Sequence, residues 1–174
     1  MLYKKDLINL LDTSGCDYFI KKHEALYTVE DSKALRGTIS GAHSKNLFLK
    51  DAKGQFYLLS IEENTSIDLK KTMKYIGSKK LSFAKAEYLY SILGIEPGSV
   101  SPFSLINDKN KKVIFYLDKK FLDSEKVNFH PLVNTATINI STLDMISFIE
   151  KHHNSVNLLD LKLLEQPLRY YKFI

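Results

Sequence analysis

Two apolar runs on either side of a turn constrain the fold of this chain more than any other feature. Residues 46–49 and 56–61 are mostly apolar, and Asp51-Ala52-Lys53-Gly54 lies between them. A Lys-Gly pair between two such runs is a turn signal. The sequence therefore predicts an antiparallel hairpin, and a sheet built around it.

The remaining pattern mixes strands and helices. Apolar and β-branched runs predict strands at residues 17–22, 103–106, 113–117 and 137–140. Apolar spacing predicts helices at residues 7–14, 67–76, 83–93 and 143–151, and a helical turn at 29–35, with Thr28 and Thr142 as N-caps. Because no steady strand–helix–strand rhythm appears, a doubly wound parallel sheet is disfavoured. The expected fold class is α+β, with a curved, mixed, mainly antiparallel and barrel-like sheet flanked by helices.

Length and composition indicate one domain. The chain has 174 residues, 44% of them hydrophobic, which suffices for one core of ordinary size. We expect this domain to span residues 1–153. Residues 154–174 form a separate C-terminal segment, packed on the domain or placed at an interface. An amphipathic helix is expected in it, from the leucines Leu158, Leu159, Leu161, Leu163 and Leu164.

The charge and the cysteine content indicate the cellular compartment and the kind of partner. The single cysteine, Cys16, excludes an internal disulfide and is typical of a reducing compartment. No apolar run approaches the roughly 18 residues that span a bilayer, so a cytoplasmic protein without a membrane partner is expected. The net charge of +5 favours an anionic partner such as nucleic acid. Because the positive charges are nearly all lysine, such a surface would bind phosphates without reading bases well.

Lys45 and Asn46 stand at the entrance of the first hairpin strand. A lysine in this position usually points into water. Here an apolar strand follows, so Lys45 would lie at the rim of any pocket lined by the sheet and could hold a phosphate or a sugar oxygen. Asn46 could orient a substrate, or it could satisfy nearby backbone groups in a turn.

The loop from Gly94 to Pro102 holds two glycines and two prolines and is therefore rigid and tightly turned. Gly98 allows the backbone to approach a ligand closely. Successive amides in such a turn form a concavity that binds anions, which suits an ester carbonyl that becomes an oxyanion. Taken alone, however, a Gly-x-x-x-Pro loop is more often structural.

Other candidates are weaker. A lone histidine before a proline, such as His130, is more often structural than catalytic. Cys16 has no acid or histidine at an informative spacing, and His152-His153 lacks the partners of a zinc site, so no metal is expected. A basic cluster is equally consistent with a solvated helix face and with contacts to RNA phosphates; its residues are Lys70, Lys71, Lys74, Lys79 and Lys80.

Three segments together resemble the signature of the YbaK-type aminoacyl-tRNA editing domains. They are Lys45-Asn46-Leu47-Phe48-Leu49, Gly98-Ser99-Val100-Ser101-Pro102 and Phe129-His130-Pro131-Leu132-Val133-Asn134. The chain is most similar to the free-standing branch associated with prolyl-tRNA synthetase, ProXp-ala. The resemblance implies the editing-domain fold and two catalytic residues, Lys45 and Gly98. It also implies a substrate-binding set of Asn46, Ser32, Ser99, Val100, Ser101, Pro102 and His130, in which His130 lines the amino-acid pocket.

The resemblance implies a trans-editing deacylase that removes alanine from tRNA(Pro), with water as the nucleophile and without cofactor, metal or covalent intermediate. The expected partners are the acceptor end of tRNA(Pro) and prolyl-tRNA synthetase. We expect a methyl-sized cavity roofed by main-chain NH groups, with the Lys45 ammonium at its mouth. Two alternatives remain open: a deacylase for cysteinyl-tRNA(Pro) or another small amino acid, and a non-catalytic module that binds tRNA or the synthetase.

Overall fold

A computed structural model gives the structure of the chain, and it describes residues 1–25 and 39–165. The strands are β1 (Tyr18–Lys22), β2 (Ala42–Asp51), β3 (Phe56–Glu62), β4 (Leu81–Phe83), β5 (Val113–Asp118), β6 (Lys126–Phe129), β7 (Ala136–Ser141) and β8 (Asn157–Leu159). The α-helices are α1 (Lys4–Thr13), α3 (Leu69–Tyr75), α4 (Ala86–Tyr88), α5 (Thr142–His152) and α6 (Leu161–Glu165). A π-helical turn, η1 (Leu89–Leu93), and two 3₁₀ helices, η2 (Pro102–Asn107) and η3 (Lys119–Asp123), complete the described elements.

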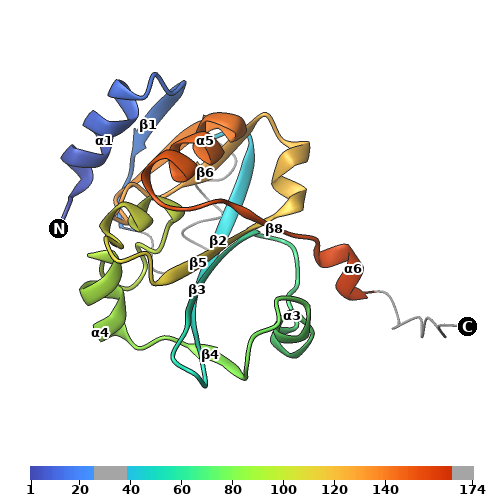
Figure 1. Cartoon of the computed structure of the whole chain (residues 1–174). Coiled ribbons are helices and arrows are strands. Elements are labelled where there is room, and N and C mark those ends of the chain that lie inside the picture. Colours follow the sequence, from blue (N-terminus) through green and yellow to red (C-terminus); the bar gives the residue numbers. More distant parts are fainter. Residues whose placement is uncertain (26–38, 166–174) are drawn as a thin grey trace, which may run out of the picture.

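All eight described strands belong to one mixed sheet (Figure 1). Its order is β1-β7-β6-β2-β3-β5-β8, and β4 pairs with the far end of β2. The pairs β1–β7, β6–β7, β2–β3 and β2–β4 are antiparallel, whereas β2–β6, β3–β5 and β5–β8 are parallel. The α+β class, the mainly antiparallel sheet and the 46–61 hairpin are confirmed. Among the described strands the sheet stays open, with β1 and β8 at its ends, so the barrel-like character does not extend to closure.

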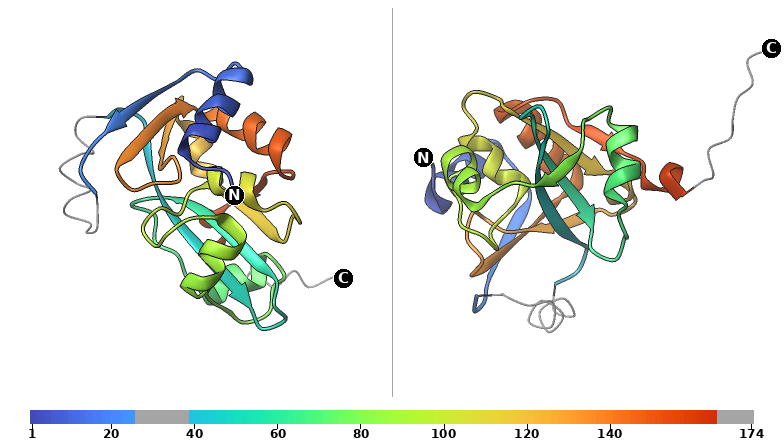
Figure 2. Two further views of the ribbon diagram at one scale, coloured as in Figure 1. Left: turned by 90° about the vertical axis from the view of Figure 1, so that its left-hand side faces the viewer. Right: turned by 90° about the horizontal axis from the view of Figure 1, so that it is seen from below.

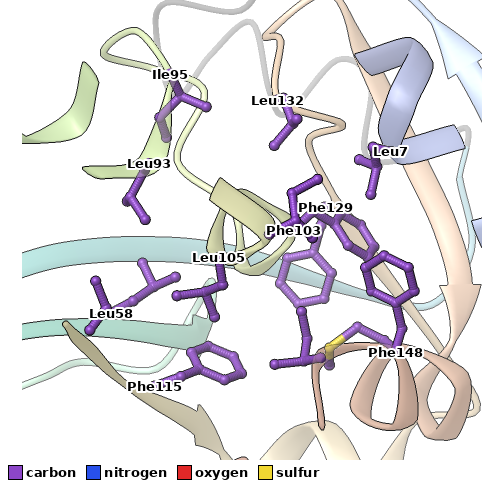
Figure 3. Close-up of a cluster of buried hydrophobic side chains, with 14 of the residues drawn as sticks. Leu7, Leu58, Leu93, Ile95, Phe103, Leu105, Phe115, Phe129, Leu132 and Phe148 are labelled. Carbon is purple, nitrogen blue, oxygen red and sulfur yellow. The ribbon is translucent and has the colours of Figure 1, made fainter. Parts of the chain in front are cut away.

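The larger core lies on one face of this sheet. Phe48, Leu58 and Phe115 face it from neighbouring strands, and helices α1, α5 and η2 contribute side chains to it. Figure 3 shows Leu58 and Phe115 with Leu7, Phe103 and Phe148 of these helices. Phe103 of η2 packs edge-on against Phe129 and Phe148, at ring-centroid distances of 6.1 and 5.8 Å. α1 and α5 lie next to each other in Figure 2. This packing fixes η2, and with it the loop that precedes η2.

A smaller core lies on the opposite face of β2 and β3. Its buried residues are Leu49, Tyr57, Leu59, Ile61, Leu81, Leu159 and Leu161. Helices α3 and α6 lie next to each other over this face (Figure 1). Since side chains alternate along a strand, odd-numbered residues of β2 face the small core and even-numbered ones face the large core.

Several local predictions need correction. Residues 103–106 form the 3₁₀ helix η2, not a strand: Ser101 caps it, Pro102 occupies its first turn, and the apolar content reflects complete burial. The helix predicted at 83–93 begins only at Ala86, because residues 81–83 pair with β2 as β4. Ser141, not Thr142, caps α5. Residues 158 and 159 pair with β5 in β8, so helix α6 begins later than the leucine pattern suggests.

No helix in the described ranges is both long enough and apolar enough to cross a membrane.

Candidate functional site

The Gly98 loop connects η1 to η2. Gly94, with φ of +65°, ends the helical segment, and residues 96–98 form an exposed tip. The amide of Ser99 donates to the carbonyl of Glu96 over 3.1 Å, which closes the turn around Gly98. Gly98 has φ of +88°, and the one described group that an added Cβ would meet is the Asn134 amide, at 3.7 Å. Glycine is therefore required here by backbone conformation more than by lack of space.

The rest of this loop is buried. Ser101 is inaccessible, and its hydroxyl accepts a hydrogen bond from the amide of Phe103 over 3.2 Å. Val100 packs against the large core, and Pro102 begins η2. Ser99 is also buried. Of the predicted substrate-binding residues in this loop, Ser101 therefore serves as a helix cap, whereas Gly98, predicted to be catalytic, is exposed.

The second predicted segment, 129–134, follows β6. His130 is half-buried, and its Nδ1 lies 2.9 Å from the carbonyl oxygen of Ala136. A carbonyl only accepts, so Nδ1 carries the proton and Nε2 is the acceptor in the neutral ring. Leu132 adopts φ of +63°, which a branched residue rarely does, while its side chain is buried in the large core (Figure 3). The loop is thus anchored at both ends of its turn.

Burial is the main cause that lowers the pKa of His130 below its ordinary value. The hydrogen bond to Ala136 opposes this effect, and the nearby His23 ring adds to it. The ring is therefore neutral near pH 7, and it offers an acceptor, not a positive charge.

His23 is a site residue that the sequence analysis missed. Its ring centroid lies 6.1 Å from that of His130. Its Nδ1 lies 2.7 Å from the carbonyl of Glu24, so Nδ1 donates and Nε2 accepts from the Thr137 hydroxyl at 3.0 Å. The β1–β7 pairing brings the two histidines together, and that pairing joins segments far apart in sequence. The position of His23 just after a predicted strand was the only local signal.

Lys45 lies in β2, just beyond its pairing with β6. The parallel register pairs Ala42 with Val127 and His43 with Asn128, and two further steps would place Lys45 level with His130. Lys45 leaves β2 on the small-core face. Its ammonium donates to the carbonyl of Glu63 over 3.2 Å and to the carbonyl of Thr65. These are its hydrogen bonds within the described residues.

Asn46 points to the opposite face of β2 from Lys45. Its Oδ1 accepts from the Ser60 hydroxyl over 2.6 Å, and its Nδ2 donates to the Ser44 hydroxyl over 3.2 Å. In this arrangement Asn46 joins β2 to β3. The Gly98 loop packs on the same, large-core side of the sheet through Ile95 and Val100.

The structure thus brings the Gly98 and His130 loops together at Asn134, with His23 beside His130. Lys45 leaves β2 on the opposite, small-core face, where the turn after β3 holds its ammonium, so this ammonium does not lie on the side of the sheet that carries the Gly98 loop. Ser32 and the helical turn predicted at 29–35 lie outside the described residues. The basic cluster is exposed on α3 and the segment after it, which is consistent both with a solvated helix face and with contacts to RNA phosphates; it comprises Lys70, Lys71, Lys74, Lys79 and Lys80.

The other predicted candidates are explained by local contacts. His153 pairs with Asp108, and the His152 ring lies tilted against that of Phe148, with the ring centroids 4.5 Å apart. Burial raises the pKa of the Cys16 thiol, which disfavours the thiolate. Within the described ranges no three His, Cys, Asp or Glu residues gather as metal ligands would.

Comparison with known proteins identifies the family of this chain. The family model for the aminoacyl-tRNA editing domain matches residues 23–148. The prolyl-tRNA editing protein ProX of Acetoanaerobium sticklandii is 35% identical over 159 residues, which cover 91% of this chain and 97% of that protein. Prolyl-tRNA synthetase associated domain-containing protein 1 of Bos taurus is 35% identical over 136 residues, covering 75% of this chain and 79% of its own.

A solved structure shares the fold. A crystal structure described as a candidate trans-editing enzyme for prolyl tRNA synthetase matches with a TM-score of 0.69 and 19% identity. The match covers 92% of this chain and 97% of that one.

Proposed function

We propose, since this chain belongs to the aminoacyl-tRNA editing domain family, that it is a trans-editing deacylase that hydrolyses the ester between alanine and tRNA(Pro). The observation that carries the proposal is the meeting of the Gly98 turn with the loop of His130, inside the region matched by the family model. One loop presents an exposed glycine turn, and the other presents a histidine whose pKa is lowered by burial.

In the proposed reaction, water attacks the ester carbonyl. The carbonyl oxygen becomes negative in the tetrahedral intermediate, and main-chain NH groups at the Gly98 turn stabilise that charge. The ester bond to the ribose then breaks, and the ribose oxygen takes up a proton. Fixed amide donors suit this step because they need little reorganisation as the charge develops.

His130 serves substrate selection in this proposal. Its Nε2 is an acceptor in a partly buried site, so it can bind the α-ammonium group of the amino acid. Proton transfer to or from water is a second role open to the same atom.

Lys45 holds the RNA end. An ammonium has three N–H donors, and the carbonyls of Glu63 and Thr65 engage two of them. Within residues 1–25 and 39–165 no acceptor engages the third, which we assign to a ribose or phosphate oxygen of the terminal nucleotide. The exposed lysines of α3 would add phosphate contacts along the acceptor stem.

A second site is needed because a pocket built for proline excludes alanine poorly. A missing methylene changes binding by only about 1–3 kcal/mol. A smaller site that admits alanine and rejects proline removes the error after it is made. Prolyl-tRNA synthetase is the partner whose errors such an enzyme would correct.

A panel of charged tRNAs tests the proposal. Release of the amino acid should be fast for alanyl-tRNA(Pro) and slow for prolyl-tRNA(Pro) and cysteinyl-tRNA(Pro). Faster turnover of the cysteinyl substrate would reassign the specificity, and binding without hydrolysis would identify a non-catalytic module.

A variant gives the matching control. Lys45→Ala should abolish deacylation while its circular dichroism spectrum stays that of the parent. Full activity in a folded Lys45→Ala protein would remove Lys45 from the site.

A further inference from the structure

We propose that Glu62 and Lys120 are positioning residues that hold Lys45 in place by fixing the turn after β3. The inference deepens the proposed function and rests on it for the role of Lys45. It rests independently on a chain of hydrogen bonds from η3 to the Lys45 ammonium.

The turn at residues 62–65 is organised by one carboxylate. Oε1 of Glu62 accepts from the backbone amide of Asn64 over 3.2 Å and from its side-chain amide over 3.0 Å. Oε2 accepts from the Thr65 hydroxyl over 3.0 Å. The backbone amide of Thr65 also donates to the carbonyl of Glu62, over 3.0 Å. The peptide groups of this turn are therefore oriented by Glu62.

The carbonyls of the same turn hold the Lys45 ammonium. Those of Glu63 and Thr65 both point to Nζ, so rotation of either peptide plane would release a donor. A free lysine side chain samples many rotamers on its four-carbon stem. Two fixed carbonyl acceptors restrict Lys45 to the rotamers that place its ammonium between them. A group that binds a reacting substrate must be held in the correct position before the substrate arrives.

Lys120 balances the charge of Glu62. The carboxylate of Glu62 is mostly buried, with 8% of the residue exposed, and Lys120 Nζ lies 2.6 Å from its Oε2. Burial acts to raise the pKa of Glu62, but hydrogen bonds from Lys120, Asn64 and Thr65 outweigh it and lower the pKa below its ordinary value. The carboxylate is therefore charged when it organises the turn.

Asp118 aligns the two partners. Its Oδ2 accepts from the backbone amide of Glu62 over 3.1 Å, and its Oδ1 accepts from the backbone amide of Lys120 over 3.0 Å. Asp118 is itself 2% exposed. The end of β3 and the start of η3 are thus fixed to one buried carboxylate, which sets the distance between Glu62 and Lys120.

Lys119 provides a matched control. It is next to Lys120 in the same 3₁₀ helix, but it pairs with Asp160 over 3.1 Å and its side chain is 58% exposed. Both lysines line a groove of about 440 Å³ between η3, α6 and residues 64–66. Replacing Lys119 therefore removes one positive charge from the groove, as replacing Lys120 does, but it leaves the ion pair of Glu62 intact.

The experiment compares Lys120→Met and Glu62→Gln with Lys119→Met in the full-length chain. The first readout is the rate at which an N-hydroxysuccinimide ester acylates the Lys45 amine, measured by peptide mass spectrometry. An amine whose N–H groups are bound by two carbonyls reacts slowly, so both test variants should acylate faster, by about threefold or more, with the control unchanged. Equal acylation rates in folded test and control variants would overturn the proposal.

The second readout is deacylation of alanyl-tRNA(Pro). A misplaced Lys45 should lower kcat/KM on the order of tenfold in both test variants, with less than about a twofold change in Lys119→Met. Glu62→Gln keeps the side-chain shape, so it tests the network if Lys120→Met proves unstable. If Lys45→Ala retains activity, the proposed function fails at Lys45, whereas the acylation rates still report whether Glu62 and Lys120 position it.

Discussion

Nε2 of His153 lies 3.1 Å from Oδ2 of Asp108, and both side chains are almost completely buried. Asp108 also accepts hydrogen bonds from the backbone amides of Lys112, over 3.0 Å, and Val113, over 2.8 Å. One carboxylate thus joins the residue after α5 to the turn that begins β5. The loop of Gly98 leads into η2, and η2 ends next to Asp108. The Asp108–His153 pair therefore helps to hold η2, and the loop before it, in place.

Asp108→Asn should lower the free energy of unfolding by about 2–3 kcal/mol, because the buried carboxylate accepts from three donors and an amide, with a single acceptor oxygen, would leave buried groups unsatisfied. Urea denaturation measures this change. Asp160→Asn, which breaks the exposed pair with Lys119, should cost less than about 1 kcal/mol. Equal losses in the two variants would show that the buried pair contributes no more than a surface one.

The same pair predicts a dependence of stability on acid pH. Burial acts to raise the pKa of Asp108, but hydrogen bonds from His153 and the two backbone amides outweigh it and leave the pKa below its ordinary value. An unfolded aspartate titrates near pH ~4, so the contribution is complete above that pH and is lost as pH falls through the lower, folded value. Chemical denaturation at several pH values below 5 should give a steeper loss for the parent chain than for Asp108→Asn.

The sequence predicted those parts of the fold that depend on neighbours along the chain. The hairpin of β2 and β3 follows from two apolar runs and a turn, and both are local. The parallel pairs β2–β6, β3–β5 and β5–β8 join distant segments, and nothing local specifies which strands meet. Residues 103–106 were misassigned because a short apolar run reads alike in a strand and in a fully buried helical turn.

The candidate site likewise has features that local sequence predicts and features that depend on distant segments. Gly98 was identifiable because a glycine between prolines signals an unusual backbone, which its positive φ confirms. The partnership of His23 with His130 depends on the register of β1 with β7, which pattern alone does not give. For Lys45 the strand was predictable, but the two carbonyls that hold its ammonium come from a turn whose shape depends on Glu62.

Gly41 at the start of β2 should tolerate no side chain. It has φ of +89°, and a Cβ there would lie 2.5 Å from the carbonyl oxygen of Lys126 on β6. Gly41→Ala should therefore cost about 3–4 kcal/mol, from backbone strain and overpacking together. Gly77→Ala is the control, because φ is +69° but no atom of the described residues lies within 4 Å, so only about 1 kcal/mol of strain is expected. Thermal denaturation of both variants measures the difference.

The lysines of α3 should contribute to RNA binding through phosphates. Lys70 and Lys74 are exposed and lie one helical turn apart, so they share a face. If each neutralises one phosphate, Lys70→Gln/Lys74→Gln should reduce the slope of log K against log salt by roughly 0.7–0.9 per lysine. The control is Lys5→Gln/Lys151→Gln, on α1 and α5, which Figure 1 shows away from α3. Equal slopes in the two double variants would place the RNA elsewhere.

The neutral state of His130 predicts how deacylation depends on pH. Because burial lowers the pKa of His130, the ring keeps its acceptor until the pH falls below the ordinary histidine value of ~6.5. The rate of alanine release, corrected for spontaneous hydrolysis, should therefore stay constant as the pH falls from 7 to the ordinary histidine pKa of ~6.5, and fall only below it. His130→Gln should abolish this fall, since its amide keeps an acceptor oxygen but does not titrate.

The histidine titration can be checked without substrate. The Cε1–H resonance of His130 in proton NMR should titrate below pH 6.5, and His23→Gln should move that titration upward, because the His23 ring is one of the causes that lower it. His152→Gln is the control, since that ring packs on Phe148 at the far end of α5. A fall in rate that survives in His130→Gln would assign the titrating group to another residue.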